Sequence, residues 1–175
     1  MTTNLKIAQL GNDVLRKIAA PVDDFNCAEF RLFLNTLENA MLEANGVGIA
    51  APQLGVAQRI IIIASRPTPR YPLAPLIDPI IMINPDFEII DAAQQKDWEG
   101  CLSVPGIRAL VPRYQAVKVS YQTQHGEFRQ ISLADFPARV FQHEFDHLQG
   151  LVYLDRVTDN RDIISESEFF KRIAA

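Results

Sequence analysis

The segment from Gln142 to His147 carries residues whose types and spacing suit metal chemistry. His143 and His147 are four residues apart, so on a helix both imidazoles project from one face toward one point. Glu144 projects beside them. In this His-Glu-x-x-His arrangement the histidines hold a divalent metal, and the glutamate moves protons for the water that the metal activates. The alternative is a helix with two ordinary core histidines.

The residues around this segment predict the helix that must position it. Phe136 and Val140 fall on the same stripe as the two histidines, so the histidines continue an apolar face that should point inward. Asp135 is the expected N-cap, and Gly150 stands where a C-terminal glycine belongs.

A catalytic site of this kind needs a third protein ligand and an open position for water. One longer metalloprotease pattern fits Gly150, but Tyr153 stands where that pattern requires histidine. A zinc endopeptidase would instead take Glu166 or Glu168 from a following helix. The third candidate is Cys101, in a segment over residues 98–106 that breaks strand alternation and exposes a thiolate and a backbone N–H. Its alternative is an inert buried cysteine.

A non-catalytic protein with a structural metal site is a rival of another class. Such a site needs four protein ligands, and Cys27 and His125 are the residues that remain available. Neither belongs to a ligand-spaced pair, which argues against this interpretation.

The length, composition and charge of the chain limit the classes of protein to which it can belong. The 175 residues, 48% hydrophobic and 22% charged, predict one globular domain over residues 1–175. The net charge of -4 gives no general attraction to nucleic acid or to an anionic membrane. The N-terminus lacks the features of a secretory signal, and the longest apolar run is too short to cross a bilayer. We therefore expect two reduced cysteines in a cytoplasmic compartment.

The remaining pattern predicts an α+β fold, with antiparallel sheets packed around the central metal-binding helix. The small residues over 46–53 predict either a plain connection or a substrate-facing strand that ends at Gln53. The proline-rich residues 66–79 predict an extended loop, because proline is excluded from helices and interior strands. Asn84-Pro85 predicts a turn, and His125-Gly126 a hairpin. Further helices are expected over 13–19, 26–44 and 163–173, and strands over 59–65, 80–83, 87–90, 116–123, 127–133 and 151–154.

Three stretches together resemble the signature motifs of the peptide deformylase family. They are residues 46–53 (Gly-Val-Gly-Ile-Ala-Ala-Pro-Gln), 99–103 (Glu-Gly-Cys-Leu-Ser) and 142–147 (Gln-His-Glu-Phe-Asp-His). Their order, their intervals and the chain length all match, and the resemblance extends over most of the chain. It implies an enzyme that removes the formyl group from the N-terminal formyl-methionine of new bacterial or organellar polypeptides and releases formate.

The resemblance assigns roles that residue chemistry alone leaves open. It selects Cys101, with the two histidines, as the metal ligands, and Glu144 as the residue that takes and returns protons. It assigns the stabilisation of charge on the formyl oxygen to the Gln53 amide and the Leu102 backbone N–H. It also gives Asp146 a supporting role.

Further expectations from the resemblance concern the surroundings of the site. A structural ion pair is expected between Glu99 and Arg113. The substrate-binding residues are expected to be an apolar pocket, a backbone partner at Gly48 and two arginines at the pocket rim: Val47, Gly48, Phe136, Val140, Arg108 and Arg139. Arg139 departs from the apolar residue expected at its position, which changes the expected width and polarity of the pocket.

One thiolate and two imidazoles suit zinc on general grounds. The resemblance instead implies Fe²⁺ in the cell, with Zn²⁺, Ni²⁺ or Co²⁺ able to replace it. The implied partners are N-formyl-Met nascent peptides, with the ribosome as a further candidate. No basic patch of the sequence indicates direct binding to nucleic acid.

Overall fold

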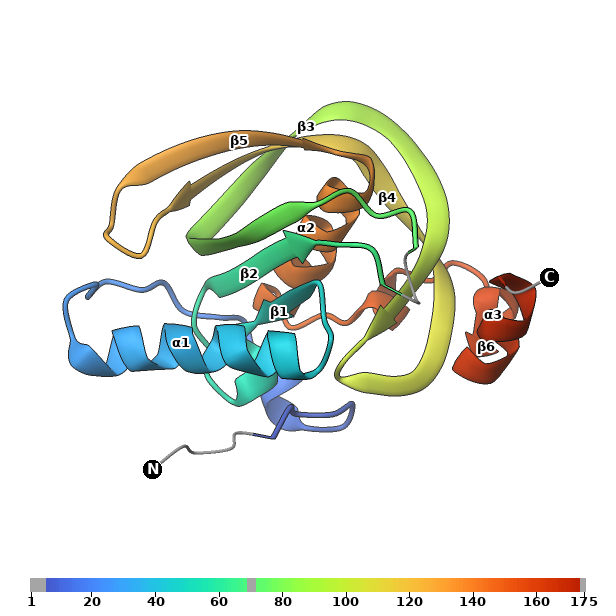
Figure 1. Ribbon diagram of the computed structural model, residues 1–175, viewed down its shortest axis with the longest axis horizontal. Helices are drawn as coiled ribbons and strands as arrows, with labels where there is room; N and C mark the ends of the chain where they lie inside the picture. Colours follow the sequence, from blue (N-terminus) through green and yellow to red (C-terminus); the bar gives the residue numbers. More distant parts are fainter. Residues whose placement is uncertain (1–5, 69–71, 174–175) are drawn as a thin grey trace.

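The computed structural model describes residues 6–68 and 72–173. Its strands form an antiparallel sheet in the spatial order β1 (Gly48–Ala50), β2 (Ile60–Ser65), β3 (Ile77–Cys101), β4 (Val104–Gln122) and β5 (Phe128–Ala134). A short sixth strand, β6 (Ile163–Ser165), pairs with β4. The long strands β3 and β4 bend over together, so the sheet curves around the helix that follows β5 (Figure 1).

In the described part of the chain, three helices accompany this sheet: α1 (Ala28–Glu43), α2 (Asp135–Leu148) and α3 (Glu166–Ile173). Short 3₁₀ turns lie at Asp13–Arg16, Ala51–Leu54, Tyr153–Arg156 and Asn160–Asp162. Helix α2 lies inside the curve of the sheet (Figure 1), and most of its residues are buried. The predicted α+β fold around a central helix is therefore confirmed.

Strand β2 is buried on both faces. Its side chains point alternately to the two faces, and each face packs in a separate layer of the core. Ile61 and Ile63 pack in the cluster that holds α2, whereas Ile60 and Ile62 pack in the cluster that holds α1. Successive strand residues point to opposite faces, so a run of isoleucines serves both helices. Each buried isoleucine contributes roughly 1.5–3 kcal/mol, which fixes the sheet between the two helices.

The predicted turn at Asn84-Pro85 is wrong, because β3 runs through it as one strand. Asn84 does adopt a left-handed backbone conformation (φ 49°), but inside a bulge where the register with β4 shifts between Ile83 and Asp86. Its side chain bonds both backbone groups of Val22, at 2.9 Å each. Residues typical of a turn thus produce a bulge here.

Pro79, expected in a loop, also lies in β3. It stands beside the register shift between Ile63 and Ser65 of β2, where a missing N–H is tolerated.

The segment around Cys101 is also more regular than expected. Strand β3 continues to Cys101, which pairs with Val104 at the start of β4, so residues 102–103 form a tight connection. The expected strand over 151–154 is not formed, and its last two residues begin the 3₁₀ turn at Tyr153–Arg156. The expected helix over 163–173 begins only at Glu166, after β6. The expected helix over 13–19 is the 3₁₀ turn at Asp13–Arg16.

The ends of α2 differ slightly from expectation. Ala134 occupies the N-cap, and Asp135 begins the helix with φ 53°. Gly150 follows the C-cap residue Gln149 with φ 73°, as a C-terminal glycine should. A Cβ atom at Gly150 would lie 2.7 Å from the Arg16 carbonyl oxygen, so the close approach also requires glycine.

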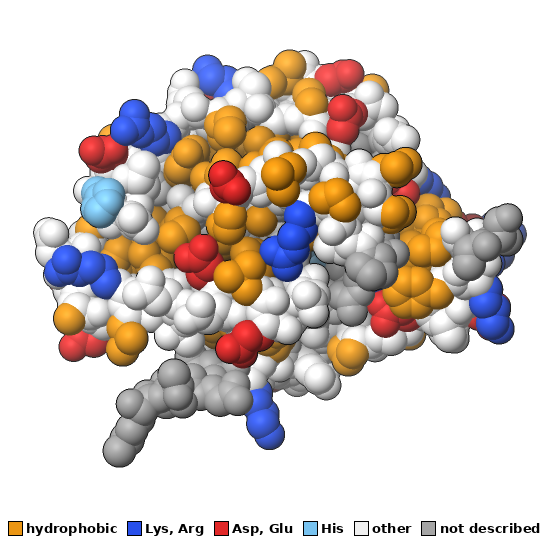
Figure 2. All heavy atoms as spheres, viewed as in Figure 1, with side chains coloured by type: hydrophobic (Ala, Val, Ile, Leu, Met, Phe, Trp, Pro, Cys, Tyr) orange, Lys and Arg blue, Asp and Glu red, His pale blue; other side chains and the backbone are white. Residues whose placement is uncertain are grey.

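Basic and acidic side chains are interspersed on the face seen in Figure 2, with apolar side chains between them. Ile90 and Phe128 are among the exposed apolar residues of β3 and β5. Among the described residues, no helix is long and apolar enough to cross a membrane.

Candidate metal centre

Cys101, at the end of β3, meets His143 and His147 of α2 in the protein interior. One ligand atom from each of the three residues lies within 4.8 Å of the others, and the Cys101 Sγ atom is 3.3 Å from His147 Nε2. The helix brings the two imidazoles to one point, and the tight β3–β4 connection brings the thiol to the same point. Among the described residues, no other group of three metal-ligating side chains converges in this way.

The three donors fit a divalent transition metal. A thiolate with two imidazoles is a common ligand set for zinc and related ions. Burial lowers the pKa of His147 well below its ordinary value, which keeps the ring in the neutral form that metals bind. The other ring nitrogen of His147, Nδ1, is buried without a hydrogen-bond partner among the described residues.

The residues proposed for rival sites are engaged elsewhere. Glu166 lies 2.7 Å from Arg108, and Glu168 lies 2.5 Å from Lys171. Cys27 caps α1, where its sulfur accepts a hydrogen bond from the Phe30 N–H. His125 is exposed in the β4–β5 connection. The geometry therefore supports neither the endopeptidase interpretation nor a closed structural site.

Glu144 lies against the backbone of β1. A Cβ atom built on Gly48 would lie 2.4 Å from the Glu144 Oε1 atom, so this close approach requires glycine. The Glu144 Oε2 atom is buried without a hydrogen-bond partner among the described residues. Burial raises the pKa of Glu144 to about 7, against an opposing effect of His143. The carboxylate is thus suited to exchange protons near neutral pH.

Glu99 fixes the orientation of the His143 ring through the Nδ1 atom. Its Oε2 atom lies 2.9 Å from the Nδ1 atom of His143, and Arg113 binds both carboxylate oxygens at 2.9 and 3.0 Å. The expected Glu99–Arg113 ion pair is therefore present. Burial acts to raise the pKa of Glu99, but Arg113 and His143 outweigh it and hold that pKa well below its ordinary value. A carboxylate in this position fixes the orientation of a metal-binding histidine.

The supporting network extends to Asp146. Arg113 donates to Asp146 at 2.6 Å, and Arg156 donates to the same carboxylate at 2.6 Å. Arg156 was not expected from the sequence, because it lies beyond the helix in the following 3₁₀ turn.

Gln53 lies in the 3₁₀ turn at Ala51–Leu54 and not at the end of a strand. Its side-chain oxygen accepts from the Ala50 N–H at 2.8 Å, and its nitrogen lies 3.5 Å from Cys101 Sγ and 3.1 Å from Ser103 Oγ. The Ser103 N–H also donates to Cys101 Sγ at 3.4 Å. Gln53 is thus fixed beside the thiol, and Ser103 is a neighbour of the thiol that sequence reasoning missed.

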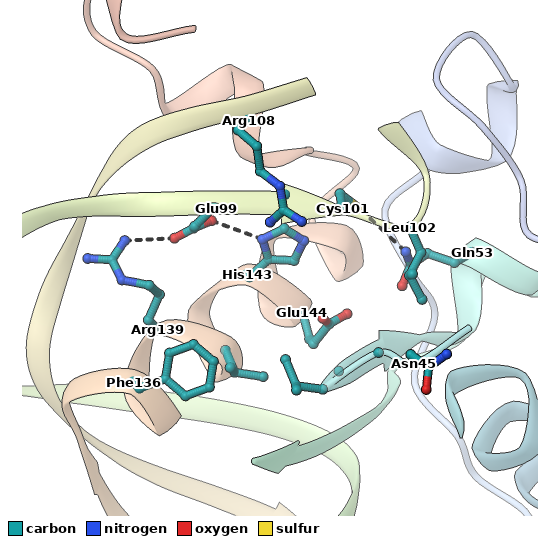
Figure 3. Close-up of a pocket in the computed structure, with 15 residues that line it drawn as sticks. Asn45, Gln53, Glu99, Cys101, Leu102, Arg108, Phe136, Arg139, His143 and Glu144 are labelled. Carbon is teal, nitrogen blue, oxygen red and sulfur yellow. Dashed lines mark hydrogen bonds and ion pairs between the residues drawn. The ribbon is translucent and has the colours of Figure 1, made fainter. Parts of the chain in front are cut away.

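A cleft of about 590 Å³, open solvent at its mouth included, lies over this site. Figure 3 shows Glu144, His143, Gln53 and Phe136 around it. All six residues expected to bind substrate line the cleft: Val47, Gly48, Arg108, Phe136, Arg139 and Val140.

The two arginines expected at the pocket rim do line the cleft, but both are buried. Arg108 is 2% exposed and Arg139 is 7% exposed. Arg108 pairs with Glu166, and Arg139 pairs with Glu99 at 2.9 Å. Arginine is buried where carboxylates compensate its charge, and these partners are distant in sequence.

Comparison with known proteins places the chain in a family. A family model described as polypeptide deformylase matches residues 4–162. Peptide deformylase 2 of Nostoc sp. is 48% identical over 165 residues, which cover 94% of this chain and 92% of the relative. Peptide deformylase 2 of Shewanella oneidensis is 44% identical, over 87% of this chain and 83% of the relative.

Comparison with solved structures gives the same family as comparison with these relatives. The Met-Ala-Ser-bound class I type b peptide deformylase from Acinetobacter baumannii superimposes with a TM-score of 0.86 and 43% identity, over 90% of this chain and 100% of that one. An actinonin complex of a peptide deformylase from Synechococcus elongatus gives a TM-score of 0.80 and 33% identity, over 91% of this chain and 81% of that one. Sequence and fold lead to one conclusion: this chain belongs to the polypeptide deformylase family, metal-dependent enzymes that remove N-formyl groups.

Proposed function

We propose that this deformylase holds one divalent metal, ferrous iron in the cell, through Cys101, His143 and His147. The observation that carries the proposal is the meeting of three ligand atoms within 4.8 Å, beside a cleft that Cys101, His143 and Glu144 line. A metal bound there would polarise the formyl carbonyl and lower the pKa of water, which would allow hydrolysis near neutral pH.

Glu144 moves the proton in this proposal. Its carboxylate accepts a proton from the attacking water and delivers it to the departing amine of methionine. The buried Glu144 side chain, with a pKa of about 7, suits both transfers. The products are formate and a free methionyl N-terminus.

Gln53 and Leu102 stabilise the negative charge that grows on the formyl oxygen. The Gln53 amide is held beside Cys101, and Leu102 follows the thiol directly and lines the cleft. Loss of one such donor typically lowers kcat by roughly 10²–10³-fold.

The peptide binds along β1, the edge strand of the sheet. Gly48 pairs with Ile63 of β2 on one side, and the Gly48 backbone also lines the cleft. A substrate in extended conformation adds its backbone to such an edge. The methionine side chain enters the apolar part of the cleft, between Val47, Phe136 and Val140.

The substrates also imply where the enzyme works. New polypeptides with formyl-methionine emerge from ribosomes, so we place the reaction in the cytoplasm or an organelle matrix, near the ribosome. The assignment of the compartment is tested by fractionation of cells that express the tagged protein.

Formate release from formyl-Met-Ala-Ser tests the proposed reaction and its metal. Protein loaded anaerobically with Fe²⁺ should release formate and lose activity in air as the iron and the thiolate oxidise. Activity should recover when a reductant returns Cys101 to the thiolate and Ni²⁺ or Co²⁺ replaces the iron. Metal analysis of each sample provides the control. Equal and air-stable activity with every metal contradicts the assignment of iron, and absence of formate release by all loaded forms contradicts the reaction.

A further inference from the structure

Arg139 stands between two cavities. It lines the cleft beside Phe136 and Val140, and it also lines a second cavity of about 670 Å³, open solvent included, at the N-terminal end of α2. Among the described residues, Phe136 and Arg139 line both cavities, and the other lining residues belong to one cavity each. The two side chains therefore form the partition between the cavities.

The guanidinium of Arg139 is held rigidly in this partition. Its Nη1 atom donates to Glu99 Oε1 at 2.9 Å and to the Val111 carbonyl at 2.7 Å, and its Nη2 atom donates to the Gln95 carbonyl at 2.7 Å. Figure 3 shows the ion pair with Glu99 beside the cleft. A planar fork with several fixed acceptors cannot swing aside to admit a longer ligand.

The hydrogen-bond donors of Arg139 also join strands β3 and β4. Pro112 of β4 lies opposite Lys96 of β3, and proline has no N–H to give to the ladder. The side chain of Arg139 supplies hydrogen bonds to carbonyls on both strands at this point. The partition is thus part of the fold, and a bound ligand is not needed to form it.

The second cavity differs in character from the apolar part of the cleft. Asp97 and Asp135 line it with two carboxylates, whereas its other arginine, Arg113, is already paired with Glu99 and Asp146. A long side chain with a positive end would suit this space, but the charge and the volume of Arg139 separate it from the cleft.

We propose that Arg139 ends the pocket for the first side chain of the substrate and excludes longer, cationic side chains such as lysine. The inference rests on the proposed function, because it assumes that this side chain enters between Val47, Phe136 and Val140. Arg139 is thus a specificity-determining residue. A methionine side chain is neutral, whereas a lysine ammonium would meet a like charge at the guanidinium.

The test compares kcat/KM for formyl-Met-Ala-Ser and formyl-Lys-Ala-Ser. In Arg139→Ala, the preference for methionine over lysine should fall by at least about tenfold, since pocket contacts discriminate by roughly 10–200-fold. Added methylguanidinium should refill the gap and restore the preference. Arg139→Gln keeps an amide donor for the strand carbonyls and should change the preference in the same direction, which covers failure of the alanine variant to fold.

Gln115→Ala is the matched control, because Gln115 lines the second cavity but not the cleft. It should leave the preference unchanged. A folded Arg139 variant with the wild-type preference overturns the inference, as does an equal shift in Gln115→Ala. Wild-type protein that releases no formate from the methionine peptide refutes the proposed function itself, so the two failures are distinguishable.

Discussion

Replacing Glu144 with glutamine should lower kcat/KM for formyl-Met-Ala-Ser by about 10²–10⁴-fold. Glutamine has nearly the same shape and fits against Gly48, but it cannot accept the proton of the attacking water. The effect should be on kcat, because Glu144 is not among the three converging ligand residues.

Two measurements separate this loss from damage to the metal site. Bound metal per protein should be the same in Glu144→Gln and in the wild type. Glu88→Gln, a change at an exposed position of β3, should keep full activity. Near-normal activity of Glu144→Gln with metal bound would remove Glu144 from the proton-transfer role.

Of all the proposed substitutions, Glu99→Ala should cause the largest loss of folding stability. Glu99 is 3% exposed and pairs with Arg113, Arg139 and His143. Removal of the carboxylate leaves two buried guanidinium groups with reduced compensation, which costs about 3–5 kcal/mol of unfolding free energy. Urea unfolding of the metal-free protein at neutral pH measures this loss.

The same change should weaken metal binding by roughly 10–100-fold, because Glu99 fixes the His143 ring. Glu127→Ala is the control: its pair with Arg129 is exposed on both sides and is worth at most about 1 kcal/mol. Equal effects of the two substitutions would show that the buried network does not support the site.

The sign of the pH dependence follows from the lowered pKa of Glu99. A carboxyl group with a lowered pKa stabilises the folded protein above its ordinary pKa, and the contribution is lost as pH falls toward the folded value. The difference in stability between wild type and Glu99→Ala should therefore be full at neutral pH and shrink in acid.

The residues of the proposed metal centre were largely predictable from the sequence, because local spacing encodes them. Two histidines one helical turn apart point to one place whatever surrounds the helix. Cys101 is different: residue chemistry allowed glutamates from α3 equally well, and only the resemblance selected the thiol. The structure then brings the thiol to the histidines through the curvature of β3 and β4.

The departures from expectation arise where contacts distant in sequence decide the local structure. Asn84-Pro85 has the composition of a turn, but bonds from Asn84 to Val22, 62 residues away, hold it in a bulge. Arg139 is polar and was expected at a rim, yet its pairing with Glu99, 40 residues away, makes burial stable. Neither partner is visible in the pattern around the residue itself.

The most direct test of the metal centre is X-ray absorption spectroscopy of the protein loaded with one equivalent of Co²⁺. Cys101, His143 and His147 predict one sulfur and two imidazole nitrogens around the metal, with a remaining position open to water. The sulfur contribution should disappear in Cys101→Ser. A spectrum without sulfur in the wild type, or with four protein ligands, would contradict the proposed centre.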